Sequence, residues 1–573
     1  MVKLEPVDPV GSLASGEFAP SWRITTPDGR ELLWDSFHTG PVVLPPEELH
    51  SICDLLLGVP WCEIATLSRV ELQPYAAALG ARPALILYSA TPLKKNFEAD
   101  LDCLRAGKPV DHPAVFVETR SVNLGRVNDL LIGRTTPWRQ AAAVSAAEAV
   151  VVPGIEYYYL THALLKQAVS HQHSPSPAIS RIVEWLRDHP GCIVRVYSLD
   201  TETQLLLLWL KRAAGLERLA IDMNGPDILE QWSQKASLHP AIRDALALSG
   251  EDGRDPFGLL EAESRLTPLF REFGVLLDRL PGYTIAKAAA DEMPVESQVR
   301  EAARLLRERY HLRLGCLKPA KATAGARITT NVALDDQSRV DLIVRQAMET
   351  DEDYVLEAQA EYLHHSITGY DFILAPSMHI VAGQIAEGAS LQFMSGTTWQ
   401  GNVYVDELTC EGLGIRREQY DVMRRGITAL LDAFTAEGRN LGLVKGGIDF
   451  AIARVGGRFG DAVLVGMQDL NLCSTGAEYM RMFLDEARAA LSGDPQDRRE
   501  TYVATKVVRP TVTGALPNLQ ALTDRRSPSY YARTITSVPG RWGLLAVGCG
   551  HPVEAAECVL SMERRLRQAE LVL

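Results

Sequence analysis

Short apolar runs alternate with longer helical patterns through the N-terminal part of the chain. The runs at residues 84–88, 114–118, 148–152 and 192–197 predict buried strands. Most of the remaining sequence between 155 and 215 predicts helices. Strands that alternate with helices are typical of a parallel α/β unit, so we expect a parallel sheet in this region.

The pattern differs at the two ends of the chain. Residues 1 to about 45 predict short strands and turns, with an alternating run at 22–26. From about 313 to 475, strands separated by glycines dominate, and a helix is predicted at 477–491. Strands at 502–508 and 544–547 and an amphipathic helix at 553–569 complete the chain. The C-terminal half is therefore expected to be richer in strands.

Composition and charge exclude several classes of protein. The chain has 573 residues, 46% of them hydrophobic and 23% charged, which is typical of a globular protein of several domains. Its net charge of -14 argues against binding a polyanion such as nucleic acid. The first residues lack the pattern of a secretory signal, and the most apolar run, 205–210, is too short to span a bilayer. We expect a cytoplasmic protein without a membrane partner.

Cysteine and histidine spacing favours neither a disulfide framework nor a zinc site. The nine cysteines are odd in number and form no CxxC pair. His171 and His173 lie in a proline-rich polar stretch that predicts a surface loop, with metal binding as the alternative.

Two segments carry residues suited to a nucleotide. In 314–328, a short strand leads to Lys318, and a loop of small residues follows that contains Lys321, Thr323 and Gly325. A strand-end lysine neutralises phosphate, and a loop of small residues lets backbone N–H groups approach a triphosphate. In 353–361, an apolar strand ends in Glu357. Each pattern alone is also compatible with an ordinary strand.

Two further segments carry oxygen ligands for a metal. Asp449 lies in the strand pattern of 443–453, and Asp469 and Asn471 end the strand pattern of 463–471. Positions i and i+2 of a strand face the same side. The glycines at 456 and 457 predict a hairpin turn, which would make the two strands antiparallel neighbours. The three side chains then form a site for magnesium.

The four segments in this order resemble the catalytic domain of the ATP-grasp family, to which D-alanine–D-alanine ligase and biotin carboxylase belong. The resemblance covers about residues 280 to 490. Lys318-Pro319 is similar to the lysine–proline before the family's phosphate loop, and Glu357 is similar to its adenine-hinge acid. Asp449 and Asp469-Leu470-Asn471 resemble its metal ligands.

The resemblance implies further contacts. Ala358 and Ala360 would offer backbone groups to adenine, and Glu361 or His365 would contact the ribose. The family's earlier nucleotide lysine would be Lys235, with Lys287 as the alternative. Glycines stand where many of these ligases have an arginine before the first metal acid, so the acyl-phosphate contact is left to Lys445, Arg327 or a distant arginine.

The resemblance also implies a fold of mixed α/β and α+β class. We expect an N-terminal β-rich segment (1–45), a Rossmann-like pre-ATP-grasp domain (46–225), and a helical connecting region that includes the start of the ATP-grasp part (226–312). An ATP-grasp catalytic domain (313–495) and a small C-terminal subdomain (496–573) follow. The C-terminal part resembles peptide ligases of natural-product pathways such as antibiotic biosynthesis.

The function implied is ATP-dependent ligation of a carboxylate to an amine through an acyl-phosphate, with ATP and two Mg²⁺ ions. The substrates would be small and amino-acid-like, and a homodimer is compatible with the family. Three alternatives remain: transfer to a thiol, hydroxyl or carrier-protein group, nucleotide binding without catalysis, and chance motif matches in an unrelated α/β protein.

Overall fold

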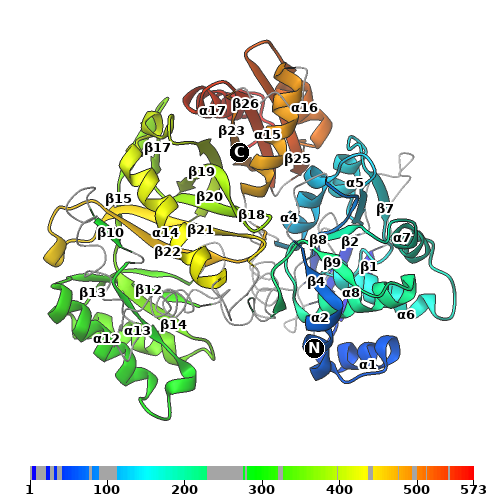
Figure 1. The fold of residues 1–573 in the computed structure, drawn as a ribbon, viewed down its shortest axis with the longest axis horizontal. Coiled ribbons are helices and arrows are strands. Elements are labelled where there is room, and N and C mark those ends of the chain that lie inside the picture. Colours follow the sequence, from blue (N-terminus) through cyan, green and yellow to red (C-terminus); the bar gives the residue numbers. More distant parts are fainter. Residues whose placement is uncertain are drawn as a thin grey trace.

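The computed structural model describes the chain with gaps. The described residues are 3–7, 21–25, 31–34, 42–75, 81–89, 113–226, 228, 275–277, 280–320, 327–395, 398–435, 443–474, 477–492, 500–511, 513–539 and 542–573. They form a mixed α/β fold that contains one parallel sheet and several antiparallel sheets. Figure 1 shows the N-terminal part (blue and cyan) beside the large sheet (yellow) and the C-terminal part (orange and red).

Three N-terminal strands form a small antiparallel sheet. They are β1 (Lys3–Val7), β2 (Ser21–Thr25) and β3 (Glu31–Trp34), paired in chain order. These strands agree with the strand-and-turn pattern of the first residues.

A six-stranded parallel sheet follows. Its strands are β4 (Leu72–Pro74), β5 (Ala84–Leu87), β6 (Leu130–Gly133), β7 (Glu148–Val151), β8 (Ile193–Val196) and β9 (Leu219–Ile221), in the order β4-β9-β8-β5-β6-β7. The chain proceeds from β5 to β7 in one direction and from β8 to β9 in the other. A ligand site is expected where the order reverses, at the carboxyl ends of β5 and β8.

Both faces of this sheet are covered. One face packs against α1 (Pro46–Leu57), α6 (Leu160–His171), α7 (Pro177–Asp188) and α8 (Thr201–Ala214). The other packs against α4 (Pro113–Arg120), α5 (Thr136–Ala142) and side chains of the C-terminal part. Helix α2 (Ile64–Glu71) precedes β4.

The strand predicted at residues 114–118 is wrong, because these residues belong to helix α4. The buried Glu118 carboxylate accepts hydrogen bonds from the backbone of Arg134 and Thr135 and from the Arg134 side chain. This tertiary contact outweighs the β-propensity of the local sequence. The strand at this place in the sheet is β6.

A four-stranded antiparallel sheet forms a second layer. Its order is β11 (Gly282–Ile285), β14 (Tyr354–Ala358), β12 (Leu314–Pro319) and β13 (Thr329–Ala333). Helices α12 (Val295–Tyr310) and α13 (Gln337–Met348) share one hydrophobic core with it.

The largest sheet joins the centre of the molecule to the C-terminal part. Its path is β10 (Val275–Leu277), β22 (Leu464–Asn471), β21 (Gly446–Arg454), β18 (Pro376–Val381), β19 (Gln384–Ser395), β20 (Thr398–Val405), β23 (Tyr502–Val508), β26 (Trp542–Cys549), β25 (Tyr530–Val538) and β24 (Arg525–Arg526). Strand β15 (Glu361–Tyr362) also pairs with β21.

Helices cover the two faces of the large sheet differently. Helices α14 (Arg417–Thr435) and α17 (Pro552–Gln568) pack on one face. Helix α15 (Ala477–Ser492) packs on the opposite face, over β23, β25 and β26. The helices predicted at 477–491 and 553–569 are confirmed by α15 and α17. The hairpin of β16 (His364–Ile367) and β17 (Tyr370–Ile373) and helix α16 (Leu516–Thr523) complete this part.

Two findings bear on the predicted environment. The described cysteines are free thiols. Across the described residues, no single helix has the length and apolarity needed to cross a bilayer, whereas the pair Pro46–Leu57 and Trp61–Glu71, bent by 69°, meets that criterion only when its two helices are taken together.

Candidate active site

Three oxygen-bearing side chains meet on two neighbouring strands. Asp449 of β21 lies directly opposite Asp469 of β22, and the strands are antiparallel. The Asn471 amide donates to Oδ2 of Asp449 at 3.0 Å, and Gln392 of β19 donates to Oδ1 at 3.1 Å. The hairpin turn between the strands contains Gly457–Phe459. The antiparallel pairing predicted for these two strands is therefore present.

An irregularity in β22 directs Asp469 and Asn471 away from the core. Val465 and Met467 face the core beneath α14, and strict alternation would send residues 469 and 471 to the same side. The register shifts by one residue at Gln468, so that Leu470 and Leu472 face the core instead. A bulge of this kind reorients side chains at a site.

The same face of β21 continues in both directions from Asp449. On one side, Ala451 and Ala453 pack with Leu280 and Ala360 in a small apolar cluster. On the other side, Gly447 and then Lys445 follow at alternate positions. Along this face the residues thus change from the apolar Ala453 and Ala451, to Asp449 with Asp469 opposite it on β22, and then to the buried cation Lys445.

Lys318 and Glu357 form an ion pair on the four-stranded sheet. The Lys318 ammonium lies 2.5 Å from Oε1 of Glu357, and both side chains are largely buried. Burial alone would lower the pKa of Lys318, but the Glu357 carboxylate raises it above its ordinary value. The lysine therefore remains a cation at neutral pH.

Tyr362 connects this ion pair to the carboxylates of the large sheet. Its hydroxyl donates a hydrogen bond to Oε1 of Gln468, the residue before Asp469. Burial raises the pKa of Tyr362 to about 12, and the charges of Lys318 and Glu357 also act on it. Tyr362 therefore lies near both groups of residues predicted from sequence.

Other predicted residues occupy separate positions. Arg327 forms an ion pair with Glu352, and the Lys287 ammonium donates to the Ala347 carbonyl at 2.7 Å. Ala358 donates its N–H to the carbonyl of Pro281. Glu361 is exposed and pairs through its backbone with β21, while His365 packs against Phe372. Lys235, Lys321, Thr323 and Gly325 lie outside the described residues.

The oxygen donors fit a hard divalent cation. Two carboxylates and an amide on adjacent strands are the ligand types that Mg²⁺ combines with substrate phosphates. Among the described residues, no group of three or more His, Cys, Asp or Glu side chains is placed to hold a metal ion. The fit therefore depends on Asn471 and on oxygens that a substrate brings.

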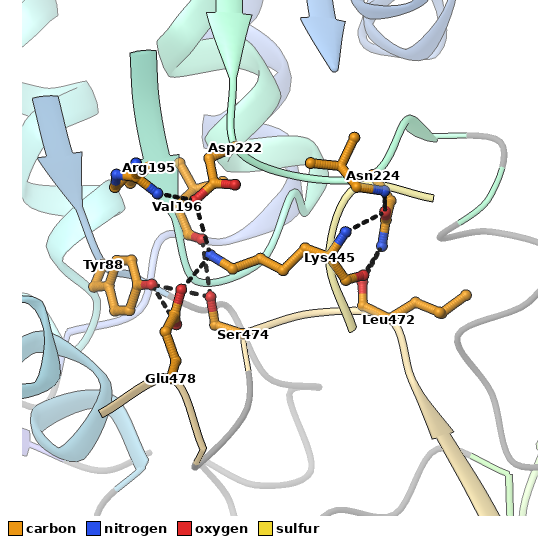
Figure 2. Close-up of polar contacts among 10 residues, drawn as sticks. Tyr88, Arg195, Val196, Asp222, Asn224, Lys445, Leu472, Ser474 and Glu478 are labelled. Atoms are coloured by element: carbon orange, nitrogen blue, oxygen red, sulfur yellow. Dashed lines mark hydrogen bonds and ion pairs between the residues drawn. The ribbon is translucent and has the colours of Figure 1, made fainter. Parts of the chain in front are cut away.

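A second polar cluster surrounds Lys445, where the parallel sheet meets the large sheet (Figure 2). The Lys445 ammonium lies 2.5 Å from Oε1 of Glu478 in α15 and 3.3 Å from Oδ2 of Asp222, which follows β9. Arg195 of β8 also pairs with Asp222. Burial alone would lower the pKa of Lys445, but Asp222 and Glu478 raise it.

Tyr88 and Ser474 extend this cluster to the switch point of the parallel sheet. The Tyr88 hydroxyl, at the end of β5, donates to Oε2 of Glu478 at 2.7 Å and lies 3.0 Å from the Ser474 hydroxyl. The Ser474 hydroxyl donates to the carbonyl of Val196 at the end of β8. The cluster therefore lies at the carboxyl ends of β5 and β8, where a ligand site is expected.

A mostly apolar groove opens beside Lys445. It is lined by Gly446, Cys473, Ser390 and Tyr404, among others, and its volume is about 60 Å³. Arg481 of α15 is exposed on its wall, near the buried His379, whose pKa is lowered to about 3 by burial and by the Arg481 charge. The groove lies on the same sheet face as Asp449, because Gln392 and Ser390 are alternate residues of β19.

The sequence patterns did not identify Asp222, Glu478, Asn224 or Arg481. Asp222 and Asn224 follow β9 after the parallel sheet, and Glu478 and Arg481 begin α15. The sequence did offer one indication for Glu478 and Arg481, because the helix that carries them begins only six residues after Asn471.

Comparisons with known proteins give matches only at the level of structure. No protein-family model matches the sequence. No curated protein matches it either. An N5-carboxyaminoimidazole ribonucleotide synthetase in complex with ADP aligns with 86% of this chain and 99% of its own, at a TM-score of 0.45 and 11% identity.

Two further structures, a D-cycloserine synthetase and a D-alanine–D-alanine ligase, also align with this chain. D-cycloserine synthetase aligns with 70% of this chain and 97% of its own (TM-score 0.31, 11% identity). D-alanine–D-alanine ligase from Coxiella burnetii aligns with 51% of this chain and 63% of its own (TM-score 0.26, 10% identity). All three TM-scores are below 0.5, so the function of this chain is inferred from its own residues.

Proposed function

We propose that this protein is an ATP-dependent ligase that joins a carboxylate to an amine and releases ADP and phosphate. One observation carries the proposal: Asp449 and Asp469 face each other on adjacent strands, and Tyr362, which bonds Gln468 beside Asp469, is close enough to the Lys318–Glu357 pair for its charges to act on it. Oxygen donors for a metal and a fixed cation for phosphate thus both lie near Tyr362.

The residues around the nucleotide have distinct roles in this proposal. Lys318 neutralises phosphate oxygens and is held in place by Glu357. Ala360, Ala451 and Ala453 provide a flat apolar surface for the base. Mg²⁺ held by Asp449, Asp469 and Asn471 would neutralise the phosphate charge during transfer.

The reaction then needs only positioning and charge neutralisation by the chain. A substrate carboxylate oxygen attacks the γ-phosphorus of ATP, and the bond to the ADP oxygen breaks. The amine nitrogen attacks the resulting acyl carbon, loses a proton, and phosphate leaves with the bonding electrons. Because an acyl-phosphate hydrolyses in water, the apolar walls of the groove protect it.

The groove beside Lys445 supports an assignment for the carboxylate substrate. The Lys445 ammonium is held between Asp222 and Glu478, and the Arg327 guanidinium is paired with Glu352. Because both cations already have carboxylate partners, we assign neither of them to the substrate. Arg481 is exposed on the groove wall and offers the planar donors that suit a carboxylate. We assign Arg481 to this contact, with an amino acid of apolar side chain as the substrate class.

The experiment is a screen of amino-acid pairs for ADP release with ATP and Mg²⁺, followed by product mass. Adding hydroxylamine traps the acyl-phosphate as a hydroxamate and separates activation from transfer. The substitution Asp469→Asn should lower ADP formation by at least about a hundredfold while the circular dichroism spectrum is retained. Full activity in this variant, or ATP binding without ADP formation by the unaltered protein, would refute the proposal.

A further inference from the structure

A second cavity lies on the other side of helix α15 from the groove. It measures about 410 Å³, which is within the range of small-molecule sites. Its walls come from residues 122–127 and 141–146 of the N-terminal part and from α15 and β25 of the C-terminal part. Figure 1 shows these elements side by side around α5, α15 and β25.

Two arginine–carboxylate ion pairs line the cavity. Both carboxylates belong to α15, whereas the two arginines come from different parts of the chain. Arg126 of the N-terminal part binds Asp485 of α15 at 2.6 Å, and Arg533 of β25 binds Glu486 of α15 at 2.7 Å. Each arginine uses one terminal nitrogen of its guanidinium in its pair. Since a guanidinium has five N–H donors, both arginines retain donors for a further acceptor.

Other polar atoms of the lining also lack partners. Among the described residues, the Nε atoms of Arg126 and Arg533 and the Nδ2 atom of Asn123 are withheld from solvent and make no hydrogen bond. Such groups normally cost free energy unless a partner satisfies them. Because these three donors are closed to solvent, an occupant meets the terminal guanidinium nitrogens of Arg126 and Arg533 that their carboxylate partners do not use, and these nitrogens call for acceptor oxygens.

The remaining surface defines the rest of the occupant. Val122, Val127, Val144, Met482 and Ile535 line the cavity with aliphatic carbon and sulfur. Asp485 and Glu486 supply carboxylate oxygens on the α15 side. A ligand with a carboxylate, an ammonium group and an aliphatic body would match all three kinds of surface.

We propose that this cavity is a binding site for a free apolar amino acid, separate from the candidate active site. The ligand carboxylate pairs with Arg126 and Arg533, and its ammonium pairs with Asp485 and Glu486. Because the opposite side of α15 carries Arg481 on the groove wall, the ligand also fixes the helix that borders both sites.

Isothermal titration calorimetry on the full chain tests the proposal with L-leucine, L-methionine and L-phenylalanine as ligands. At least one should bind saturably, and its amide and its deamino acid should bind at least about tenfold more weakly, since each lacks one charge. Arg126→Gln and Glu486→Gln should each weaken binding by a similar factor. Arg139→Gln, on the exposed side of α5, is the matched control and should leave it unchanged.

A variant of the candidate active site separates the two sites. Arg481→Ala should leave this binding intact while it weakens any binding in the groove, so failure of the ligase proposal would not affect the result. The proposal is overturned when none of the three amino acids binds below about 10 mM. It is equally overturned when Arg126→Gln and Glu486→Gln bind as the unaltered protein does.

Discussion

The side-chain amide of Asn224 forms two hydrogen bonds with the backbone of Lys445. Its Nδ2 donates to the Lys445 carbonyl at 2.6 Å, and its Oδ1 accepts from the Lys445 N–H at 3.1 Å. The same amide also donates to the Leu472 carbonyl and accepts from the Val444 N–H. One fully buried side chain from the parallel sheet thus joins the start of β21 to the end of β22.

We expect Asn224→Asp to loosen the two strands that carry the metal ligands. The new carboxylate would face the carbonyl oxygens of Lys445 and Leu472, and a lost buried hydrogen bond costs about 1–3 kcal/mol. The Mg²⁺ concentration for half-maximal ADP formation should rise, and excess Mg²⁺ should restore part of the rate. A purely structural role would lower stability without this shift. Asn518→Asp, at an exposed amide-to-carbonyl bond, is the control.

The cluster around Lys445 predicts a non-additive pair of substitutions. Lys445→Met should destabilise the protein by about 3–5 kcal/mol, because it leaves Glu478 and Asp222 without their ammonium partner. Adding Glu478→Gln should recover part of this loss in urea unfolding. If Lys445 serves only to join the parallel sheet to α15, activity returns together with stability. Recovered stability without activity would instead favour a direct contact between Lys445 and substrate.

Nucleotide affinity compares the two lysines, among the described residues, that the sequence suggested as nucleotide contacts. Lys318→Met should raise the KM for ATP by about tenfold or more, because it removes a buried cation from the proposed phosphate site. Lys287→Met is the matched comparison, since the Lys287 ammonium donates to the Ala347 carbonyl. A larger effect at Lys287 than at Lys318 would reverse the assignment.

The sequence predicted the antiparallel pairing of the strands that carry Asp449, Asp469 and Asn471, because this pairing depends on local rules. A glycine-containing turn makes two adjacent strands antiparallel, and side chains two positions apart share a face. The bulge at Gln468 was not predicted. It is nevertheless required, since the alternation of Val465 and Met467 alone would point Asp469 into the core.

Other features were beyond prediction because they depend on distant residues. Asp222 and Lys445 are 223 positions apart, and no local pattern shows that they meet. Helix α4 was predicted as a strand, because its apolar residues have high β-propensity while the deciding contact of Glu118 is with Arg134. Buried ion pairs between distant parts of the chain become visible only in three dimensions.

Arg481 provides a test of the substrate groove. Arg481→Ala should raise the KM for the carboxylate substrate by about tenfold, since a charge-assisted hydrogen bond contributes about 1.5–3 kcal/mol. The KM for ATP should not change, because Arg481 lines the groove beside Lys445 rather than the Lys318 region. Arg526→Ala, at an exposed position of β24, is the control. An equal rise in both constants would contradict the assignment.

Because His162 is buried, we predict that the free energy of unfolding decreases in mild acid. Its Nδ1 accepts a hydrogen bond from the Leu44 N–H at 3.1 Å, and burial, together with the Arg134 charge, lowers the pKa of His162 to about 3. In the unfolded chain this pKa is about 6.5. Between these two values only the unfolded chain binds the proton, so the free energy of unfolding falls as pH decreases, by about 1.4 kcal/mol per pH unit for this group.

Urea unfolding between about pH 7 and pH 5 measures this effect. His162→Gln should have a shallower dependence of unfolding free energy on pH than the unaltered protein, because glutamine has no proton to gain. His364→Gln, at an exposed histidine of β16, should retain the full dependence. The remaining slope in His162→Gln would come in part from His379, whose pKa is lowered in the same direction by burial. An unchanged slope in His162→Gln would show that His162 accepts a proton in the folded protein as readily as in the unfolded chain.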